Sequence, residues 1–197
     1  MKKFFPVLEF INVPNLVTTA GLIFGLVACY YIIEGDLRGT YICLFFSALL
    51  DSVDGFLAGK LNQKTRFGQY MDSLVDFFIC CIMPVWMCIV FVGNDLPLTI
   101  AAVFYCVCGL WRLAYYNVTA SENRSYFTGL PVPSGLLLTG MAIWLVVYQD
   151  ITPWFCAAIF ILAGLMMISS MRLEKYGLWQ KALCLVGLGF FVMIAIS

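Results

Sequence analysis

The sequence contains no histidine and only 11% charged residues, whereas an ordinary soluble domain carries about 25%. The missing histidine excludes histidine-based acid–base catalysis and imidazole zinc sites, so a general base has to be Asp, Glu, Lys or Tyr. A basic excess is also absent, because 11 Lys and Arg balance 11 Asp and Glu. This balance argues against a nucleic-acid-binding module, and the scarcity of charge argues against a disordered chain.

Metal-binding and disulfide patterns of cysteine are missing as well. The chain has nine cysteines, but none forms a CxxC pattern and all lie in apolar runs. Cysteine in such runs behaves as a small hydrophobic residue packed between helices, and disulfide frameworks belong to small secreted chains. We therefore expect free thiols.

Apolar residues, in contrast, make up 63% of the 197 residues. A soluble core of this length cannot bury so much apolar surface. Since a transmembrane helix needs about 20 residues, the chain has room for about six to eight of them and none for a separate soluble domain. We predict an all-α polytopic membrane helical bundle in which residues 1–197 form a single integral-membrane domain.

Short polar segments divide the apolar residues into seven predicted spans. These are residues 14–34, 38–60, 67–93, 97–119, 130–149, 152–171 and 177–196. Lys181 lies near the start of the last span, so whether that span crosses the membrane is left open. Residues 1–13 mix aromatic, aliphatic and charged side chains, as short interfacial segments do.

Basic residues predict the orientation. With the N-terminus in the cytoplasm, the inner segments carry ten of the eleven basic residues: Lys2, Lys3, Lys60, Lys64, Arg66, Arg112, Arg124, Arg172, Lys175 and Lys181. The outer loops then carry only Arg38. This positive-inside bias predicts a multi-pass protein of the cell membrane with a cytoplasmic N-terminus.

Four aspartates stand inside predicted spans. Asp51 and Asp54 lie near the inner end of one span, and Asp72 and Asp76 lie near the inner start of the next. A charge at the centre of a membrane helix costs ~2.5–3.5 kcal/mol, and less near its ends. No nearby intramembrane Lys or Arg supplies a partner, so the four carboxylates need another compensating charge.

The spacing of the aspartates brings them together. Residues at i, i+3 or i, i+4 share a helix face, and the short connection makes the two spans antiparallel neighbours. Four converging carboxylates predict a site for hard divalent cations, Mg²⁺ or Mn²⁺. Two metal ions about 3.5–4 Å apart are the usual device for phosphoryl transfer. The alternative is that four helix-end aspartates simply reach water.

Small and basic residues surround these aspartates. Gly55 and Ala58 lie about one turn away, where they leave room for a bulky ligand or allow close helix packing. Lys60, Lys64 and Arg66 lie at the mouth of the predicted site. They serve either as plain positive-inside residues or as phosphate contacts.

The same region resembles the CDP-alcohol phosphotransferase family, whose pattern is D-x2-D-G-x2-A-R-x8-G-x3-D-x3-D. The chain reads Asp51-x2-Asp54-Gly55-x2-Ala58-Gly59-x8-Gly68-x3-Asp72-x3-Asp76. Seven of the eight fixed positions match over residues 51–76. Gly59 stands where the family has Arg, which removes one phosphate contact. Lys60 is placed to compensate, although a lysine point charge differs from an arginine fork.

The resemblance implies roles for these residues. It implies that Asp51, Asp54, Asp72 and Asp76 hold two Mg²⁺ or Mn²⁺ ions per active site and that Asp76 is also the catalytic base. The CDP-lipid site that we expect comprises Asn15, Thr18, Gly55, Ala58, Lys60, Lys64, Arg66 and Gly68. Asn15 is equally placed to be a helix N-cap. The resemblance also implies a homodimer with its active site facing the cytoplasm.

Two further segments concern the acceptor alcohol. Residues 108–118 (CGLWRLAYYNV) resemble the C-G-x-x-R-L-A-R-[FY]-N stretch of phosphatidylserine synthases. Residues 126–135 (YFTGLPVPSG) resemble their F-x-G-[LM]-P-x-P stretch. These resemblances imply transfer of the phosphatidyl group from CDP-diacylglycerol to L-serine. We predict direct attack by the serine hydroxyl, with Asp76 as the general base, because the sequence has no histidine and Asp76 is the deepest of the four aspartates. Arg112 then holds the serine carboxylate and Asn117 orients its polar groups, while Tyr115 stands where those proteins have Arg.

Other interpretations are open. Residues 61–68 (LNQKTRFG) also resemble phosphatidylinositol synthases, so inositol, inositol phosphate or glycerol 3-phosphate is an alternative acceptor. Arg112 is alternatively a helix-end arginine that snorkels to the interface. A divalent-cation transporter is another class of function, because intramembrane carboxylates also line ion paths. A transporter site lies near the midplane, whereas these aspartates cluster toward the predicted inner face. An inactive member that only binds the CDP-lipid is a third hypothesis.

Overall fold

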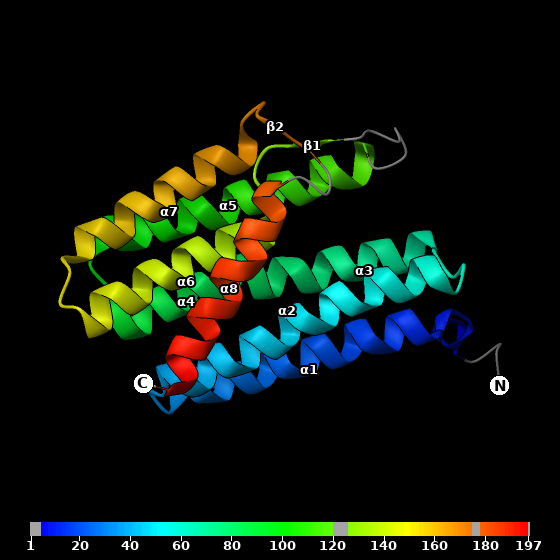
Figure 1. The fold of residues 1–197 in the computed structure, drawn as a ribbon, viewed down its shortest axis with the longest axis horizontal. Coiled ribbons are helices and arrows are strands. Elements are labelled where there is room, and N and C mark those ends of the chain that lie inside the picture. The colour runs from blue at the N-terminus through cyan, green and yellow to red at the C-terminus, as the bar shows by residue number, and fades with distance from the viewer. Residues whose placement is uncertain (1–4, 120–125, 175–177, 197) are drawn as a thin grey trace.

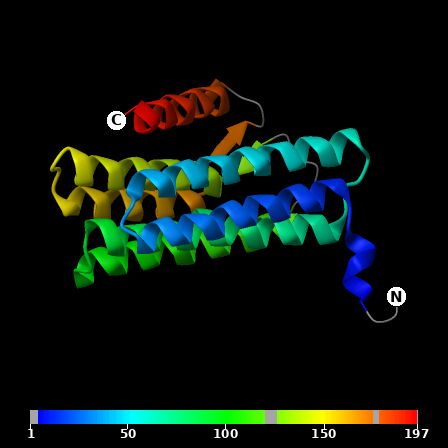
Figure 2. The same cartoon turned by 90° about the horizontal axis from the view of Figure 1, so that it is seen from below.

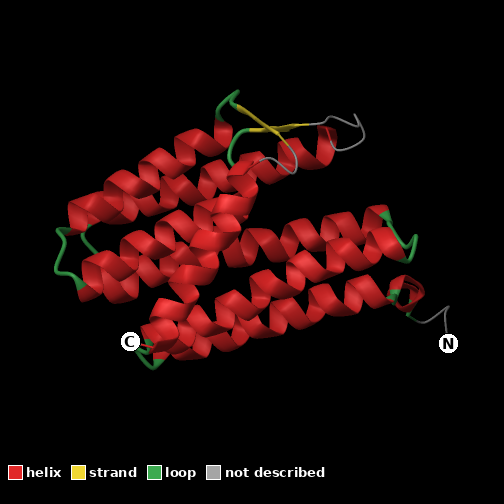
Figure 3. Cartoon of the chain, in the orientation of Figure 1, coloured by secondary structure: helices red, strands yellow, loops and turns green. Residues whose placement is uncertain are grey.

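The computed structural model describes residues 5–119, 126–174 and 178–196 (Figure 1). Lys2, Lys3, Arg124 and Lys175, which entered the orientation argument, lie outside these ranges. Helices dominate the described chain, and only short connections join them (Figure 3). The predicted all-α class is confirmed.

The helices follow the apolar segments in order. They are η1 (Pro6–Phe10), α1 (Val13–Ile33), α2 (Leu37–Lys60), α3 (Arg66–Asp76), η2 (Phe77–Ile82), α4 (Met83–Met87), η3 (Cys88–Val92), α5 (Leu96–Thr119), α6 (Val132–Tyr148), α7 (Pro153–Ile168) and α8 (Leu178–Ile196). η1 is a 3₁₀-helix, and η2 and η3 are π-helices. The stretch from α3 to η3 is therefore one continuous helical unit with two widened turns, and each predicted span coincides with a helical unit.

Four helical units are long and apolar enough to cross a membrane. They are Val13–Ile33, Leu37–Lys60, Arg66–Val92 and Leu96–Thr119. Three shorter apolar helices follow at Val132–Tyr148, Pro153–Ile168 and Leu185–Ile194. The membrane helical bundle is thus confirmed, while crossing by the three shorter helices stays a prediction.

The long helices run roughly side by side, and α8 crosses them obliquely (Figures 1 and 2). The ring of Phe191 on α8 stacks on Phe45 of α2, with 3.8 Å between ring centroids. Phe190 meets Tyr41 of α2 and Trp144 of α6 edge-on. Aromatic contacts therefore fasten α8 to α2 and α6.

A small antiparallel pairing joins two connections that are distant in sequence. β1 (Tyr126–Thr128) pairs with β2 (Arg172–Glu174), with Thr128 opposite Arg172. Gly129 follows β1 with φ +76°, and a side chain there would collide with the carbonyl oxygen of Met167. The sequence patterns did not predict this pairing, which ties the start of α6 to the end of α7.

The core contains the expected free thiols. Eight of the nine cysteines are described as free, and most of them are buried. Cys29 is an example of a half-buried thiol, with its Sγ 3.6 Å from the Sδ of Met83. The prediction of packed, unlinked cysteines is confirmed for these eight.

Candidate metal and substrate site

Three of the four intramembrane aspartates converge. Asp51 on α2 and Asp72 and Asp76 on α3 each offer a carboxylate oxygen, and these oxygens all lie within 4.8 Å of one another. All three residues are half-buried, and among the described residues no Lys or Arg pairs with them. Crowded anions in a poorly solvated place repel each other unless a cation binds them. Oxygen donors of this kind fit a hard divalent metal ion.

Asp54 lies apart from this group and faces α1. Its Oδ2 accepts a short hydrogen bond from Oγ1 of Thr18, and both residues are buried. The structure therefore places Asp54 beside the expected nucleotide residue Thr18, outside the closest group but still near enough to interact electrostatically with the other three carboxylates. Its role as a metal ligand stays a prediction.

The first turn of α1 is held against the start of α3. Asn12, not Asn15, is the N-cap of α1, because the Oδ1 of Asn12 accepts from the backbone N of Asn15 at 2.9 Å. The Nδ2 of Asn15 donates to the carbonyl of Phe10 at 2.8 Å. A Cβ at Gly68 would lie 2.8 Å from Oδ1 of Asn15. Glycine at position 68 therefore permits the close approach of α1, and the N-cap alternative for Asn15 is wrong.

Two contacts beside Gly68 escaped the sequence analysis. Thr65 is the N-cap of α3, and its Oγ1 accepts from the backbone N of Gly68 at 3.0 Å. Phe10 and Phe67 stack with 4.4 Å between ring centroids. A threonine three residues before a glycine near a helix start is a readable N-cap signal. The pairing of Phe10 with Phe67 has no local signal, because it joins segments distant in sequence.

The C-terminal end of α2 offers open space and one folded-back cation. Nothing lies within 4 Å of the position that a Cβ on Gly55 would occupy. At Gly59 the nearest neighbours of such a Cβ are Cε of Lys64 at 3.7 Å and Nζ of Lys64 at 4.0 Å. The Nζ of Lys60 instead lies 5.9 Å from the ring centroid of Phe56. Lys64, rather than the expected Lys60, therefore lies over Gly59.

The remaining residues of the expected CDP-lipid site lie near Gly59 in the chain. Ala58 is half-buried on α2, and Arg66 is exposed at the first residue of α3. The loop between these helices turns through Asn62, which has φ +52°. This tight turn makes α2 and α3 antiparallel, as predicted, and brings both helix ends to one end of the bundle (Figure 1).

Arg112 on α5 is a buried cation for which the described part of the chain supplies no anion. Only 6% of the residue is exposed, and its Nε has no hydrogen-bond partner among the described residues. Its guanidinium carbon lies 5.9 Å from the ring centroid of Tyr116. This burial contradicts the snorkelling alternative, because a snorkelling arginine reaches outward to water. A buried guanidinium is costly unless it is paired, so Arg112 is suited to bind an anionic group.

Asn117 joins α5 to α3. Its Oδ1 accepts from Nε2 of Gln69 at 3.1 Å and from Oγ of Ser73 at 3.2 Å. Ser73 is the neighbour of Asp72 in the chain, so these bonds place the end of α5 next to the carboxylates. The side-chain oxygen of Asn117 is thus occupied, and its Nδ2 is the part left for a substrate.

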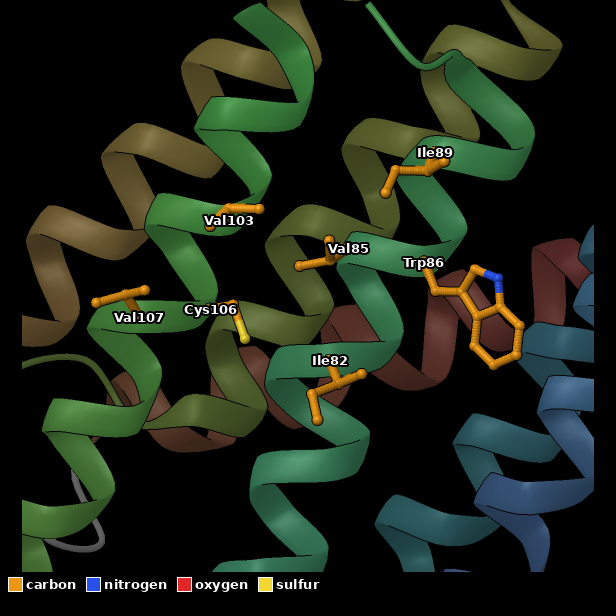
Figure 4. A pocket seen from close by; sticks show the side chains of 7 residues that line it. All are labelled: Ile82, Val85, Trp86, Ile89, Val103, Cys106 and Val107. Carbon is orange, nitrogen blue, oxygen red and sulfur yellow. The ribbon is translucent and has the colours of Figure 1, made fainter. Parts of the chain in front are cut away.

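A separate apolar groove lies between η2–η3 and α5 (Figure 4). It encloses about 260 Å³ and is lined by Ile82, Val85, Trp86, Ile89, Val103, Cys106 and Val107. These side chains supply no carboxylate and no cation. The chemistry therefore belongs to the carboxylate end of the bundle.

Known proteins are similar to this chain in sequence and in fold. The sequence model described as CDP-alcohol phosphatidyltransferase matches residues 11–171. CDP-diacylglycerol–serine O-phosphatidyltransferase from Methanocaldococcus jannaschii is 30% identical over 200 residues, which cover 96% of this chain and 91% of that protein.

Two crystal structures of Mycobacterium tuberculosis phosphatidylinositol phosphate synthase share the fold. The complex with manganese and citrate has a TM-score of 0.61 and 22% identity, and covers 84% of this chain and 81% of that chain. The structure with CDP-diacylglycerol bound has a TM-score of 0.62 and 18% identity. The match covers 94% of this chain and 89% of that chain. At these identities the likeness concerns the fold alone.

Proposed function

The chain belongs to the CDP-alcohol phosphatidyltransferase family, and on that premise we propose that it transfers the phosphatidyl group of CDP-diacylglycerol to L-serine and releases CMP. The group of Asp51, Asp72 and Asp76 carries this proposal, because it provides the divalent-metal site that such a transfer needs. The serine transferase from M. jannaschii, similar over nearly the whole chain, supports serine as the acceptor. Membership of this family also argues against the hypothesis of a divalent-cation transporter.

The three converging carboxylates and Asp54 are the residues that would hold the ions. We propose two ions per active site, Mg²⁺ or Mn²⁺, and manganese in the M. tuberculosis synthase crystal supports this choice. Bound there, they would neutralise the charge that develops on the transferring phosphate and on CMP. The bond from Thr18 fixes Asp54 at the side of α1.

The CDP-lipid is expected between the first turns of α1 and the end of α2. Open space at Gly55 lets the nucleotide approach the backbone, with Ala58 one turn further along. Lys64 over Gly59 is placed to supply a cation for the diphosphate, and Lys60 and Arg66 add positive charge at the mouth. Asn15 and Gly68 hold α1 and α3 together beneath this site.

The acceptor is expected on the α5 side of the cluster. A serine carboxylate satisfies the buried guanidinium of Arg112 through charge-assisted hydrogen bonds. The Nδ2 of Asn117 is available to orient the acceptor, since the Oδ1 is occupied by α3. Inositol, inositol phosphate and glycerol 3-phosphate remain the alternative acceptors, but uncharged inositol leaves Arg112 without a partner.

The reaction that we propose is a direct transfer. Asp76 takes the proton of the serine hydroxyl while its oxygen forms a bond to the lipid-side phosphorus, and the bond to the CMP oxygen breaks. Asp76 is one turn further along α3 than Asp72, on the side away from the mouth. A nucleophile held beside Asp76 therefore approaches the phosphate from the side opposite the nucleotide.

The deciding assay measures CMP release by the purified protein with CDP-diacylglycerol and Mn²⁺. Serine, inositol, inositol phosphate and glycerol 3-phosphate are supplied in separate reactions. We expect release with serine, well above that in a reaction without acceptor. Release only with another alcohol would move the assignment to that alcohol, and no release with any of them would refute the proposed activity.

A second assay tests the direct mechanism. Labelled CMP is incubated with CDP-diacylglycerol, enzyme and Mn²⁺ in the absence of serine. A covalent phosphatidyl-aspartate would exchange the label into CDP-diacylglycerol, whereas direct transfer forbids that exchange. Label uptake at a rate comparable to turnover would therefore refute direct attack while leaving the metal site intact.

The localisation that we propose is the cell membrane, with the active site facing the cytoplasm and the chain forming a homodimer.

A further inference from the structure

The helix that carries Asp72 and Asp76 changes its winding directly after the second aspartate. α3 ends at Asp76, and the next residues, Phe77–Ile82, form the π-helix η2. The backbone N of Met83 accordingly bonds to the carbonyl of Phe78, five residues earlier. π-turns are rare in proteins, and those that occur often lie at functional sites. The widened turn needs support from outside its own helix, because its backbone bonds depart from the regular ladder.

Tyr105 on α5 supplies that support. Pro84 has no N–H, so the carbonyl of Cys80, four residues earlier, cannot accept the backbone bond of a regular α-helix. The hydroxyl of Tyr105 donates to this carbonyl oxygen at 2.7 Å. Tyr105 is completely buried, and its ring meets Phe160 edge-on with 5.3 Å between centroids. The packing of the ring therefore fixes the hydroxyl on Cys80.

Two glycines make this contact possible. A Cβ at Gly135 would lie 2.8 Å from the hydroxyl oxygen of Tyr105. A Cβ at Gly109 would collide with Sγ of Cys81. Gly109 lies one turn after Tyr105 on α5, on the same helix face, so α5 contacts residues 80 and 81 together. The place of the η2 turn is thus set by α5 at two adjacent points.

Cys80 links this turn to the carboxylate cluster. Its Sγ lies 3.8 Å from Oδ1 of Asp76, a sulfur–oxygen hydrogen-bond distance at which the thiol donates. Asp76 also offers an oxygen to the group formed with Asp51 and Asp72. A group that hydrogen-bonds to a metal-ligating side chain orients it, and its loss costs about 10–100-fold in metal affinity.

We propose that Tyr105 and Cys80 are positioning residues for Asp76. Tyr105 holds the backbone of Cys80, and the Cys80 thiol fixes the carboxylate of Asp76 in the orientation that binds the metal ion. The inference rests on the proposed function, because it takes Asp76 as a metal ligand. It adds Cys80 of the proline-interrupted η2–α4 segment and Tyr105 of α5, neither of which belongs to a charged or motif position.

The test measures Mn²⁺ binding by the purified protein in the absence of substrates. Electron paramagnetic resonance of the free ion is the readout. We expect Cys80→Ala to raise the Kd for Mn²⁺ about 10-fold. Tyr105→Phe keeps the ring but removes the hydroxyl that donates to the Cys80 carbonyl, and we expect a rise in the same direction. Cys80→Ser keeps a donor and should stay within about threefold of wild type.

Cys43→Ala is the matched control, because it removes a buried free thiol from α2 and no hydrogen bond to Asp76. We expect its Kd to equal that of the wild type. An equal rise in Cys43→Ala and Cys80→Ala, or equal Kd values for Cys80→Ser and Cys80→Ala, would overturn the proposal in favour of packing. Wild-type affinity in Cys80→Ala, in protein that releases CMP, would refute the positioning role alone. A wild-type protein that neither binds Mn²⁺ nor releases CMP would refute the proposed function as well.

Discussion

The two sides of the site carry opposite and unpaired charge. The α2–α3 side presents Asp51, Asp72 and Asp76 within one small volume, and the α5 side presents the buried cation of Arg112. Neither side neutralises the other, although Asn117 joins α5 to α3 between them. Proteins rarely bury charge without a partner. The contrast supports the proposal that one side binds cations and the other an anion, both supplied by ligands.

The largest effect is expected from removing a carboxylate on the α2–α3 side. Asp72→Asn keeps the shape of the side chain but removes a charge from a cluster with none to spare. CMP release should fall by about 1000-fold or more, and Mn²⁺ binding should be lost in the same preparation. Asp95→Asn, an exposed aspartate in the connection before α5, is the control and should keep wild-type turnover. Activity above a few per cent in folded Asp72→Asn would contradict a shared metal site.

The next effect concerns the α5 side and sharpens the contrast. Arg112→Ala should raise the KM for serine about 10–100-fold, because a charge-assisted hydrogen bond contributes about 1.5–3 kcal/mol. The KM for CDP-diacylglycerol should change by less than about threefold. Arg112→Lys, which keeps the charge but loses the planar fork, should fall between the two. If both KM values rise together, Arg112 does not distinguish the two substrates.

A smaller effect is expected from the cation over Gly59. Lys64→Ala should raise the KM for CDP-diacylglycerol about 10-fold, because it removes the ammonium nearest the family's arginine position. Lys60→Ala, whose ammonium lies toward Phe56, should have an effect of less than about threefold.

Adding Gly59→Arg to Lys64→Ala should restore much of the lost affinity, since the new side chain enters the space that Lys64 occupied. A double variant no better than Lys64→Ala would show that the two positions do not share one role. Equal effects of the two lysine variants would show that only the overall positive charge matters.

The last effect concerns stability rather than activity and lies on the α2–α3 side. Gly68→Ala places a methyl group 2.8 Å from Oδ1 of Asn15, so the amide of Asn15, which donates to the carbonyl of Phe10, has to shift. Overpacking of this kind costs about 1–3 kcal/mol, which a thermal unfolding scan in detergent detects as a lower Tm. Gly55→Ala is the matched control, because its added methyl group meets no neighbour and Tm should be unchanged. A Tm for Gly68→Ala equal to that of the control would contradict the close contact.

The sequence predicted the α2–α3 side well because its signals are local. Apolar runs mark the helical units, and the i, i+4 spacing places Asp72 and Asp76 on one face of α3, near Asp51 of α2. The helix periodicity and the short connection suffice to bring these three carboxylates together. Asp54 was expected in the same group, but its bond to Thr18, on another helix, turns it toward α1.

The features that escaped prediction depend on contacts between distant segments. The π-turn after Asp76 is supported by Tyr105 on α5, and its sequence reads as an ordinary apolar helix. Lys64 reaches Gly59 across the turn between α2 and α3, whereas sequence proximity alone favoured Lys60. β1 and β2 are too short to show alternation, so their pairing has no periodic signal.

The hydrogen bonds of Asn117 have a thermodynamic consequence. Its side-chain oxygen accepts hydrogen bonds from Gln69 and Ser73 on the helix of two proposed metal ligands, while its own helix carries Arg112. On the proposed function, ions that order the α3 carboxylates would therefore also order the helix proposed to bind the acceptor. Linkage is reciprocal. If bound Mn²⁺ raises the affinity for serine by a certain factor, bound serine raises the affinity for Mn²⁺ by the same factor. The ion and the amino acid should therefore act as mutual effectors across a single amide group.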